Sequence, residues 1–234
     1  MVRSFLLATA LAILSTSSQA PAQIPAPKKT ETLQTQQHTM RYEEFGSPTA
    51  PATIILLHGA SGPDFPPYRP EAEFFATQGY YVLLPHYFDV SSGNTPSDAN
   101  CQAWVNAVAD LIAAQRSLPG NGPRKIGLIG LSLGSSVALA AGSQGLPIEA
   151  IADWYGSLPD SFFYKLKAMP PLLILHGELD RNIPVSSARQ LQKLCELKHL
   201  TCESHLYSDQ AHGFSGAALL DAQQRTLALF AKYL

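Results

Sequence analysis

The chain has 234 residues, a formal net charge of −2 and 15% charged residues. Nucleic-acid binding relies on clustered Lys and Arg, so this balance gives no reason to expect nucleic acid as a partner. Without the amino-terminal segments described next, the length suits one domain that can bury a sizeable core.

The first 20 residues are typical of a secretory signal peptide. Arg3 supplies a positive start, residues 5–14 are apolar, and residues 18–20 form a small-residue cleavage site. Roughly ten apolar residues are too few to cross a hydrocarbon core about 30 Å thick, so we expect no stable membrane insertion after cleavage. The sequence therefore predicts an exported protein, periplasmic or secreted, whose mature chain begins at Pro21.

Residues 21–38 are rich in Pro, Gln, Thr and Lys, and few of them are apolar. This composition predicts a flexible lead-in to a domain that spans residues 39–234. The domain should begin with an edge strand at residues 40–45. The continuous apolar run at residues 53–57 suits a central parallel strand.

Strands and helices alternate along the rest of the domain. The strand-like segments are 80–84, 125–129, 150–154, 172–177 and 202–207, and the helical segments are 71–78, 104–116, 135–141, 188–197 and 217–233. This alternation predicts an α/β fold with a mostly parallel, doubly wound sheet and helices on both faces. Asp98 or Asn100 could cap the second helix. The connections leave no room for a large lid, so we expect an open pocket.

The most informative motif lies between a predicted strand and a predicted helix. It reads Gly130-Leu131-Ser132-Leu133-Gly134. A serine on such a sharp turn exposes its hydroxyl, and glycines leave room for the bend. A Gly/Ser loop could show the same pattern by chance, but the strand–turn–helix context favours Ser132 as a nucleophile.

Two later positions strengthen this interpretation. Asp180 lies three residues beyond a predicted strand, and His212 follows the strand at residues 202–207. The order Ser132, Asp180, His212 is nucleophile, acid, histidine, and the carboxyl ends of parallel strands share one edge of a sheet where the three can converge. Asp153, one strand earlier, is the rival acid. His212 could also be an ordinary surface histidine.

With these motifs the chain resembles the α/β-hydrolases and, within them, the dienelactone hydrolase family. The resemblance runs from about residue 40 to the end. Besides the serine motif, it rests on Trp154-Tyr155-Gly156, His176-Gly177-Glu178-Leu179-Asp180 and Ala211-His212-Gly213-Phe214. It implies a single-domain α/β-hydrolase fold and an enzyme that acts on ester bonds.

Two departures from the family bear on the substrate. The enzymes that gave the family its name use a cysteine nucleophile, where this chain has Ser132. They also hold a substrate carboxylate with arginines, whereas the corresponding stretches here contain none. These stretches read His86-Tyr87-Phe88-Asp89 and Phe214-Ser215-Gly216-Ala217.

The expected chemistry is hydrolysis of a small-molecule carboxylic ester or lactone through an acyl-enzyme. Ser132 would attack the carbonyl, His212 would act as base and then acid, and Asp180 would orient the imidazole. The backbone N–H groups of Leu133 and Ala60 would stabilise the oxyanion. We expect no cofactor, and either a monomer or a small homo-oligomer.

Aromatic residues gather in loops that should lie at the carboxyl edge of the sheet, and several should line an acyl or alcohol pocket. These candidates are Phe65, Tyr68, Phe88, Tyr155, Phe162, Phe163 and Phe214. His86 could border the same pocket. His58, His86 and His212 match no recognised ligand spacing, so we expect no metal site.

The chain has three cysteines, which is an odd number for an exported protein. Cys195 ends a helical pattern and Cys202 begins the next strand. An oxidising compartment would favour a disulfide between them, although its geometry cannot be read from the sequence. Cys101 would then be free and buried.

Two other hypotheses stay open. A small peptidase or an acyltransferase could use the same three residues, although no subsite for a peptide amine is apparent. A binding protein could have kept the fold and lost the chemistry, but the presence of Ser132, Asp180 and His212 argues against it.

Overall fold

The computed structural model describes residues 29–118, 123–164, 166 and 168–234. The expected signal peptide and residues 21–28 of the expected lead-in lie outside these ranges.

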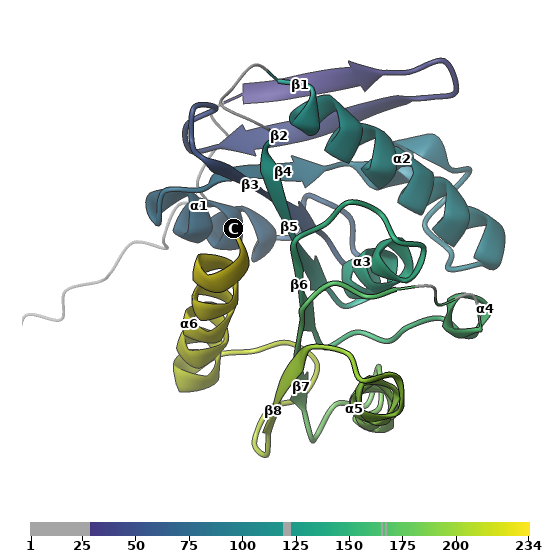
Figure 1. Cartoon of the computed structure of the whole chain (residues 1–234), viewed down its shortest axis with the longest axis vertical. Helices are drawn as coiled ribbons and strands as arrows, with labels where there is room; N and C mark the ends of the chain where they lie inside the picture. Colours follow the sequence, from purple (N-terminus) through teal and green to yellow (C-terminus); the bar gives the residue numbers. More distant parts are fainter. Residues whose placement is uncertain (1–28, 119–122, 165, 167) are drawn as a thin grey trace, which may run out of the picture.

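In the described chain, one eight-stranded sheet forms the centre of the molecule (Figure 1). Its spatial order is β1 (Lys29–Gln34), β2 (Thr39–Phe45), β4 (Tyr81–Pro85), β3 (Ala52–Leu57), β5 (Lys125–Leu131), β6 (Ala150–Trp154), β7 (Leu172–Gly177) and β8 (Cys202–Tyr207). The six strands from β3 to β8 run parallel, whereas β1 and β2 pair antiparallel with their neighbours. The predicted mostly parallel α/β sheet is confirmed.

The amino-terminal edge of the sheet differs from the expectation. Residues 29–34, expected within the flexible lead-in, form β1, in which Lys29 lies opposite Glu44 and Gln34 opposite Thr39. β2 is therefore flanked on both sides and is not the predicted edge strand. Because no residue of β1 is fully buried, its sequence lacks the apolar alternation that would have revealed it.

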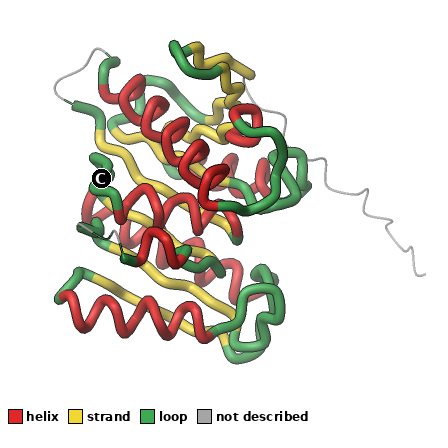
Figure 2. The backbone as a smooth tube through the Cα atoms, turned by 90° about the vertical axis from the view of Figure 1, so that its right-hand side faces the viewer, coloured by secondary structure: helices red, strands yellow, loops and turns green. Residues whose placement is uncertain are grey.

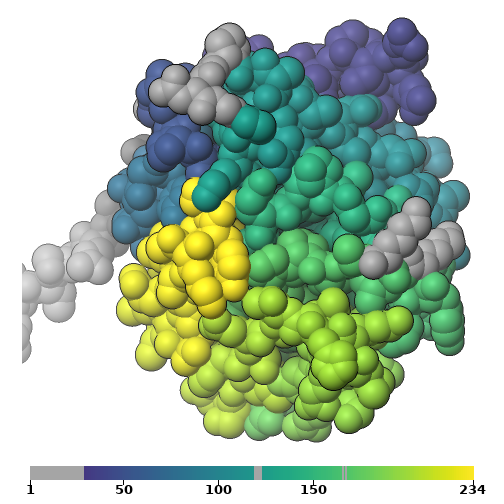
Figure 3. Space-filling model, in the orientation of Figure 1, coloured from purple at the N-terminus to yellow at the C-terminus, as the bar shows by residue number. Residues whose placement is uncertain are grey.

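Helices cover both faces of the sheet, as Figures 1 and 2 show. One face carries α1 (Tyr68–Thr77) and α6 (Gly216–Tyr233), and the other carries α2 (Asp98–Arg116), α3 (Leu133–Ser143) and α5 (Ser186–Lys198), with the short α4 (Asp160–Phe163) beside them. Each face buries its own apolar cluster, so the central strands are buried on both sides. In the space-filling view the two ends of the described chain lie apart, β1 in purple and α6 in yellow (Figure 3).

One local prediction was also inaccurate. Ser97, not Asp98 or Asn100, caps α2, because its hydroxyl accepts the N–H of Asn100 at 3.1 Å. Between β4 and α2 the chain forms a 3-10 helix, η1 (Tyr87–Val90). No helix in the described ranges is both long and apolar enough to cross a bilayer.

Candidate active site

Ser132 occupies the sharp turn between β5 and α3. Its φ of +56° places it in the left-handed region, which non-glycine residues rarely adopt. A Cβ atom at Gly130 would collide with the backbone of Ser135, and one at Gly134 would collide with the carbonyl of Leu57. Both glycines are therefore required for the bend, which presents the serine hydroxyl at the amino end of α3.

Three polar side chains meet at the carboxyl end of the sheet. His212 Nε2 lies 2.8 Å from Ser132 Oγ, and His212 Nδ1 lies 2.7 Å from Asp180 Oδ2. The Asp180 side chain is fully buried, whereas the His212 side chain is 22% exposed. The structure thus brings together the three residues that the sequence placed in separate loops.

The loop after β7 holds Asp180 in place. The Asp180 Oδ1 accepts the N–H groups of Asn182 at 2.8 Å and Ile183 at 2.9 Å. The His176 ring contacts the carbonyl of Ile183 at 2.9 Å, and its Nε2 lies 3.4 Å from Asp180 Oδ2. These contacts leave Oδ2 directed at the imidazole of His212.

Asp153, the rival acid, is fully buried on β6 and bonds elsewhere. Its Oδ1 accepts the N–H of Gly156 at 2.9 Å and the hydroxyl of Ser135. Burial raises the pKa of this carboxyl, and the two hydrogen bonds oppose that shift. The acid that contacts His212 is therefore Asp180.

Leu133 and Ala60, the two expected oxyanion donors, line the smaller of two cavities together with Ser132. Leu133 is the first residue of α3, where an N–H has no partner within the helix. Ala60 belongs to the loop after β3, which Tyr68 supports by accepting the N–H of Gly59 at 2.8 Å. In the described chain no hydrogen bond uses the N–H of Ala60, so both groups can donate to an oxygen bound near Ser132.

Two cavities meet at Ser132. The smaller, of about 390 Å³, is lined by Ala60, Pro96, Ser97, Asp98, Cys101, Trp104, Ser132, Leu133, Ser136, Ser157, Pro159 and Ile183. The larger, of about 880 Å³, is lined by Ala60, Ser61, Phe65, Pro67, Tyr68, Ser132, Tyr155, Asn182, Ile183 and residues 209–215. Both volumes suit small-molecule sites.

Four of the seven aromatic candidates, Phe65, Tyr68, Tyr155 and Phe214, line the larger cavity. The other three lie elsewhere, because each belongs to a short helix, η1 or α4, where the sequence predicted a loop. Phe162 is 1% exposed in the core, and Phe163 faces a separate cavity between α4 and α5. Phe88 packs its ring 4.7 Å from His58 and 5.2 Å from Trp104.

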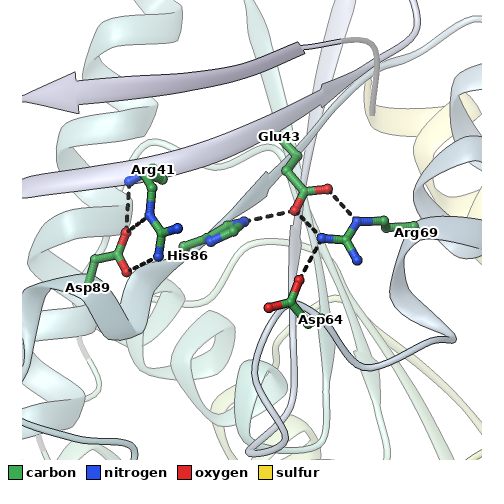
Figure 4. A network of polar contacts seen from close by, with 6 residues as sticks. All are labelled: Arg41, Glu43, Asp64, Arg69, His86 and Asp89. Carbon is green, nitrogen blue, oxygen red and sulfur yellow. Dashed lines mark hydrogen bonds and ion pairs between the residues drawn. The ribbon is translucent and has the colours of Figure 1, made fainter. Parts of the chain in front are cut away.

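The remaining histidine candidates serve the fold. His86 does not border either cavity, because it is buried and its Nε2 lies 2.9 Å from Glu43 Oε1 (Figure 4). Burial lowers the pKa of His58 to about 4, so this ring is neutral, and it stacks on Tyr87 at 4.1 Å. Among the described residues, no group of three or more His, Cys, Asp or Glu is placed to hold a metal ion.

Cys195 at the end of α5 and Cys202 at the start of β8 are joined by a disulfide. Cys101 is free and buried on α2, where it lines the smaller cavity. Sequence reasoning missed the lining role of Cys101 and Trp104. Both lie on a helix far from the motifs, and only the packing of α2 on the sheet turns them toward Ser132.

Known proteins resemble this chain in sequence. The model of the dienelactone hydrolase family matches residues 44–233. A mouse (Mus musculus) protein named carboxymethylenebutenolidase homolog is 27% identical over 193 residues, which cover 76% of each chain.

Solved structures share the fold. Thermogutta terrifontis esterase 2 superposes with a TM-score of 0.71 and 16% identity, over 91% of this chain and 96% of its own. The dienelactone hydrolase from Anabaena variabilis gives a TM-score of 0.70 and 17% identity, over 91% of this chain and 100% of its own.

Proposed function

Because the chain belongs to the dienelactone hydrolase family, whose members are hydrolases that act on ester bonds, we propose that it cleaves a carboxylic ester or lactone through an acyl-enzyme on Ser132. The observation that carries this proposal is the hydrogen-bonded series from Ser132 through His212 to Asp180. A serine hydroxyl is a weak nucleophile at neutral pH, and such a series activates it.

In the first step Asp180 accepts the Nδ1–H of His212, which leaves Nε2 free to take the proton of Ser132. The serine oxygen bonds to the substrate carbonyl carbon. The carbonyl oxygen becomes an oxyanion, which accepts the N–H groups of Leu133 and Ala60.

In the second step the tetrahedral intermediate breaks its bond to the leaving oxygen, which takes the proton from His212. Water then enters by the same route. His212 removes one of its protons, the resulting oxygen attacks the acyl-enzyme, and the acid leaves as the serine recovers its proton. No step requires a group beyond these residues and water.

The experiment that tests the proposal is reaction with a fluorophosphonate probe, followed by intact mass. We expect one adduct per chain and none on Ser132→Ala, because the probe reacts with activated serines. Ser135→Ala is the matched control: this serine also lies near the turn, but its hydroxyl bonds Asp153, so its variant should keep the adduct. Folded wild-type protein that forms no adduct would contradict the proposal and favour a binding protein.

Export to an oxidising compartment, periplasmic or extracellular, is a second part of the proposal. The signal-like pattern of residues 1–20 supports it. The disulfide between Cys195 and Cys202 also supports it, because reducing compartments disfavour such bonds.

A further inference from the structure

Besides Ser132 and Ala60, the two cavities are lined by different residues of the proposed catalytic machinery. They share Ala60, Ser132 and Ile183, so an ester whose carbonyl lies at Ser132 extends one arm into each. His212 lines only the larger cavity, and Leu133 lines only the smaller one.

This difference orients the substrate. The leaving oxygen must lie within hydrogen-bond reach of His212, which protonates it. The alcohol arm therefore extends into the larger cavity, and the acyl arm extends into the smaller one, beside Cys101 and Trp104. The orientation rests on the proposed function, because it uses the roles of Ser132 and His212.

The charges around the two cavities limit which charged groups each arm of the ester can carry. Neither Lys nor Arg is among the described residues that line the two cavities, and the charged lining residues are Asp98 in the smaller and Asp209 in the larger. Arg69, the neighbour of Tyr68, is held by Glu43 at 2.6 and 2.7 Å and by Asp64 at 2.8 Å (Figure 4). It is therefore not available to a substrate carboxylate, and a buried carboxylate without a partner is unfavourable.

From these observations we propose that the enzyme selects esters with an uncharged acyl chain, bound along Cys101 and Trp104, and a separate alcohol portion, bound among the aromatic residues of the larger cavity. An ester of a dicarboxylic acid with a free carboxylate on its acyl arm is a poor substrate. The shape of the smaller cavity sets the preferred length of the acyl chain, and this preference does not depend on the alcohol in the larger cavity.

A crossed set of substrates tests the orientation. One series keeps the p-nitrophenol leaving group and lengthens the acyl chain from acetate to octanoate, and the other compares acetates of p-nitrophenol and 2-naphthol. Cys101→Leu narrows the smaller cavity, so kcat/KM for the octanoate relative to the acetate should fall roughly tenfold. In the same variant, the ratio of kcat/KM between the acetates of the two alcohols should stay unchanged.

Phe65→Ala is the matched variant in the larger cavity, where Phe65 is 44% exposed. It should change the ratio between the two alcohols and leave the acyl-length profile unchanged. If Cys101→Leu fails to fold, Ser157→Trp at the partly exposed rim of the smaller cavity should shorten the acyl preference in the same way. The orientation would be overturned if Cys101→Leu changed only the ratio between the two alcohols and Phe65→Ala changed only the acyl-length profile.

The charge part of the proposal has its own test. p-Nitrophenyl butyrate and mono-p-nitrophenyl succinate have acyl chains of the same length, but the succinate ends in a carboxylate. We expect kcat/KM for the succinate to be lower by roughly 100-fold or more, and Asp98→Asn to recover several-fold of that loss. Equal rates for the two esters would contradict the proposal.

Labelling with the fluorophosphonate probe distinguishes a failure of the proposed orientation from a failure of the proposed function. Wild-type protein that forms the adduct but shows no division between acyl and alcohol effects would overturn this inference and leave the proposed function intact. Protein that neither forms the adduct nor hydrolyses any ester would overturn both.

Discussion

At the scale of single residues, two buried aspartates lie on neighbouring strands or in the loops that follow them, and their partners decide their roles. Asp180 faces the imidazole of His212, whereas Asp153 accepts hydrogen bonds from Ser135 and Gly156. The two carboxylates therefore predict different consequences for the same substitution.

We expect Asp180→Asn to lower kcat for p-nitrophenyl acetate by about 10³- to 10⁴-fold, because the amide cannot hold His212 in the required tautomer. Asp153→Asn keeps an oxygen that can accept from Ser135 and Gly156, so kcat should be largely unchanged. Steady-state kinetics of the two variants test this difference. A large loss of kcat in Asp153→Asn alone would make Asp153 the orienting acid.

The sequence sufficed to predict the meeting of Ser132, Asp180 and His212, because each residue follows a strand and parallel strands end at one edge. It did not suffice for the aromatic residues. Phe162 and Phe214 were both expected in loops, yet Phe162 lies in α4 and packs in the core, whereas Phe214 lines the cavity. The direction of a loop side chain depends on the packing of its whole neighbourhood, which short sequence patterns do not record.

At the scale of elements, an ion-pair network ties β2 to α1 and to the residues after β4 (Figure 4). Glu43 on β2 is 2% exposed and contacts both Arg69 and His86. Burial alone would raise the pKa of Glu43, but the hydrogen bonds from His86 and Arg69 dominate and lower it. Ionised Glu43 therefore stabilises the fold.

We expect Glu43→Gln to lower the free energy of unfolding at pH 7 by roughly 2–4 kcal/mol, since it leaves Arg69 without its buried partner. The wild-type carboxyl titrates below its ordinary value of 4.5 in the folded state. Its contribution is complete above pH 4.5 and is lost as the pH falls through the folded pKa, so the gap between the two proteins should close on acidification.

Denaturant unfolding from pH 3 to pH 7 measures this gap. Asp64→Asn is the matched control, because Asp64 contacts the same Arg69 but its side chain is 85% exposed, and it should have little effect at any pH. A gap for Glu43→Gln that stays constant with pH would contradict the assignment of the stabilisation to the ionised carboxyl.

The central strands were predictable because they are continuous apolar runs, of which Ala52–Leu57 and Leu172–Gly177 are examples. β1 was not, because its sequence, KTETLQ, has no buried face to impose a pattern. β1 pairs with β2 through its backbone N–H and carbonyl groups, which any polar sequence can supply.

At the scale of the whole molecule, the site and the disulfide lie at opposite ends of the sheet. Ser132 and His212 follow the carboxyl ends of strands, whereas Cys202 begins β8 and bonds Cys195 at the end of α5. The bond closes a short connection at the rim, where it stabilises the fold without contacting the chemistry.

We expect protein recovered from the exporting host to have the intact mass of a chain that begins at Pro21, less the two hydrogens that are lost when one disulfide forms. Burial raises the pKa of Cys101 to about 12, so native protein should resist alkylation. Denatured protein should take up one alkyl group before reduction and three after it. Three reactive thiols without reduction, or a mass that begins at Met1, would contradict the export proposal.

Tyr68 has a consequence for any attempt to evolve this protein in the laboratory. Its ring lines the cavity for the alcohol, and its hydroxyl accepts the N–H of Gly59, one residue before the N–H that would stabilise the oxyanion. A library that randomised position 68 would change substrate fit and catalytic rate together, and selection could not separate them. Phe65 and Phe214 line the same cavity, and no hydrogen bond in the described chain ties their side chains to the loop of Ala60. They are the positions at which new alcohol specificities can be sought while the rate of the chemical step is kept.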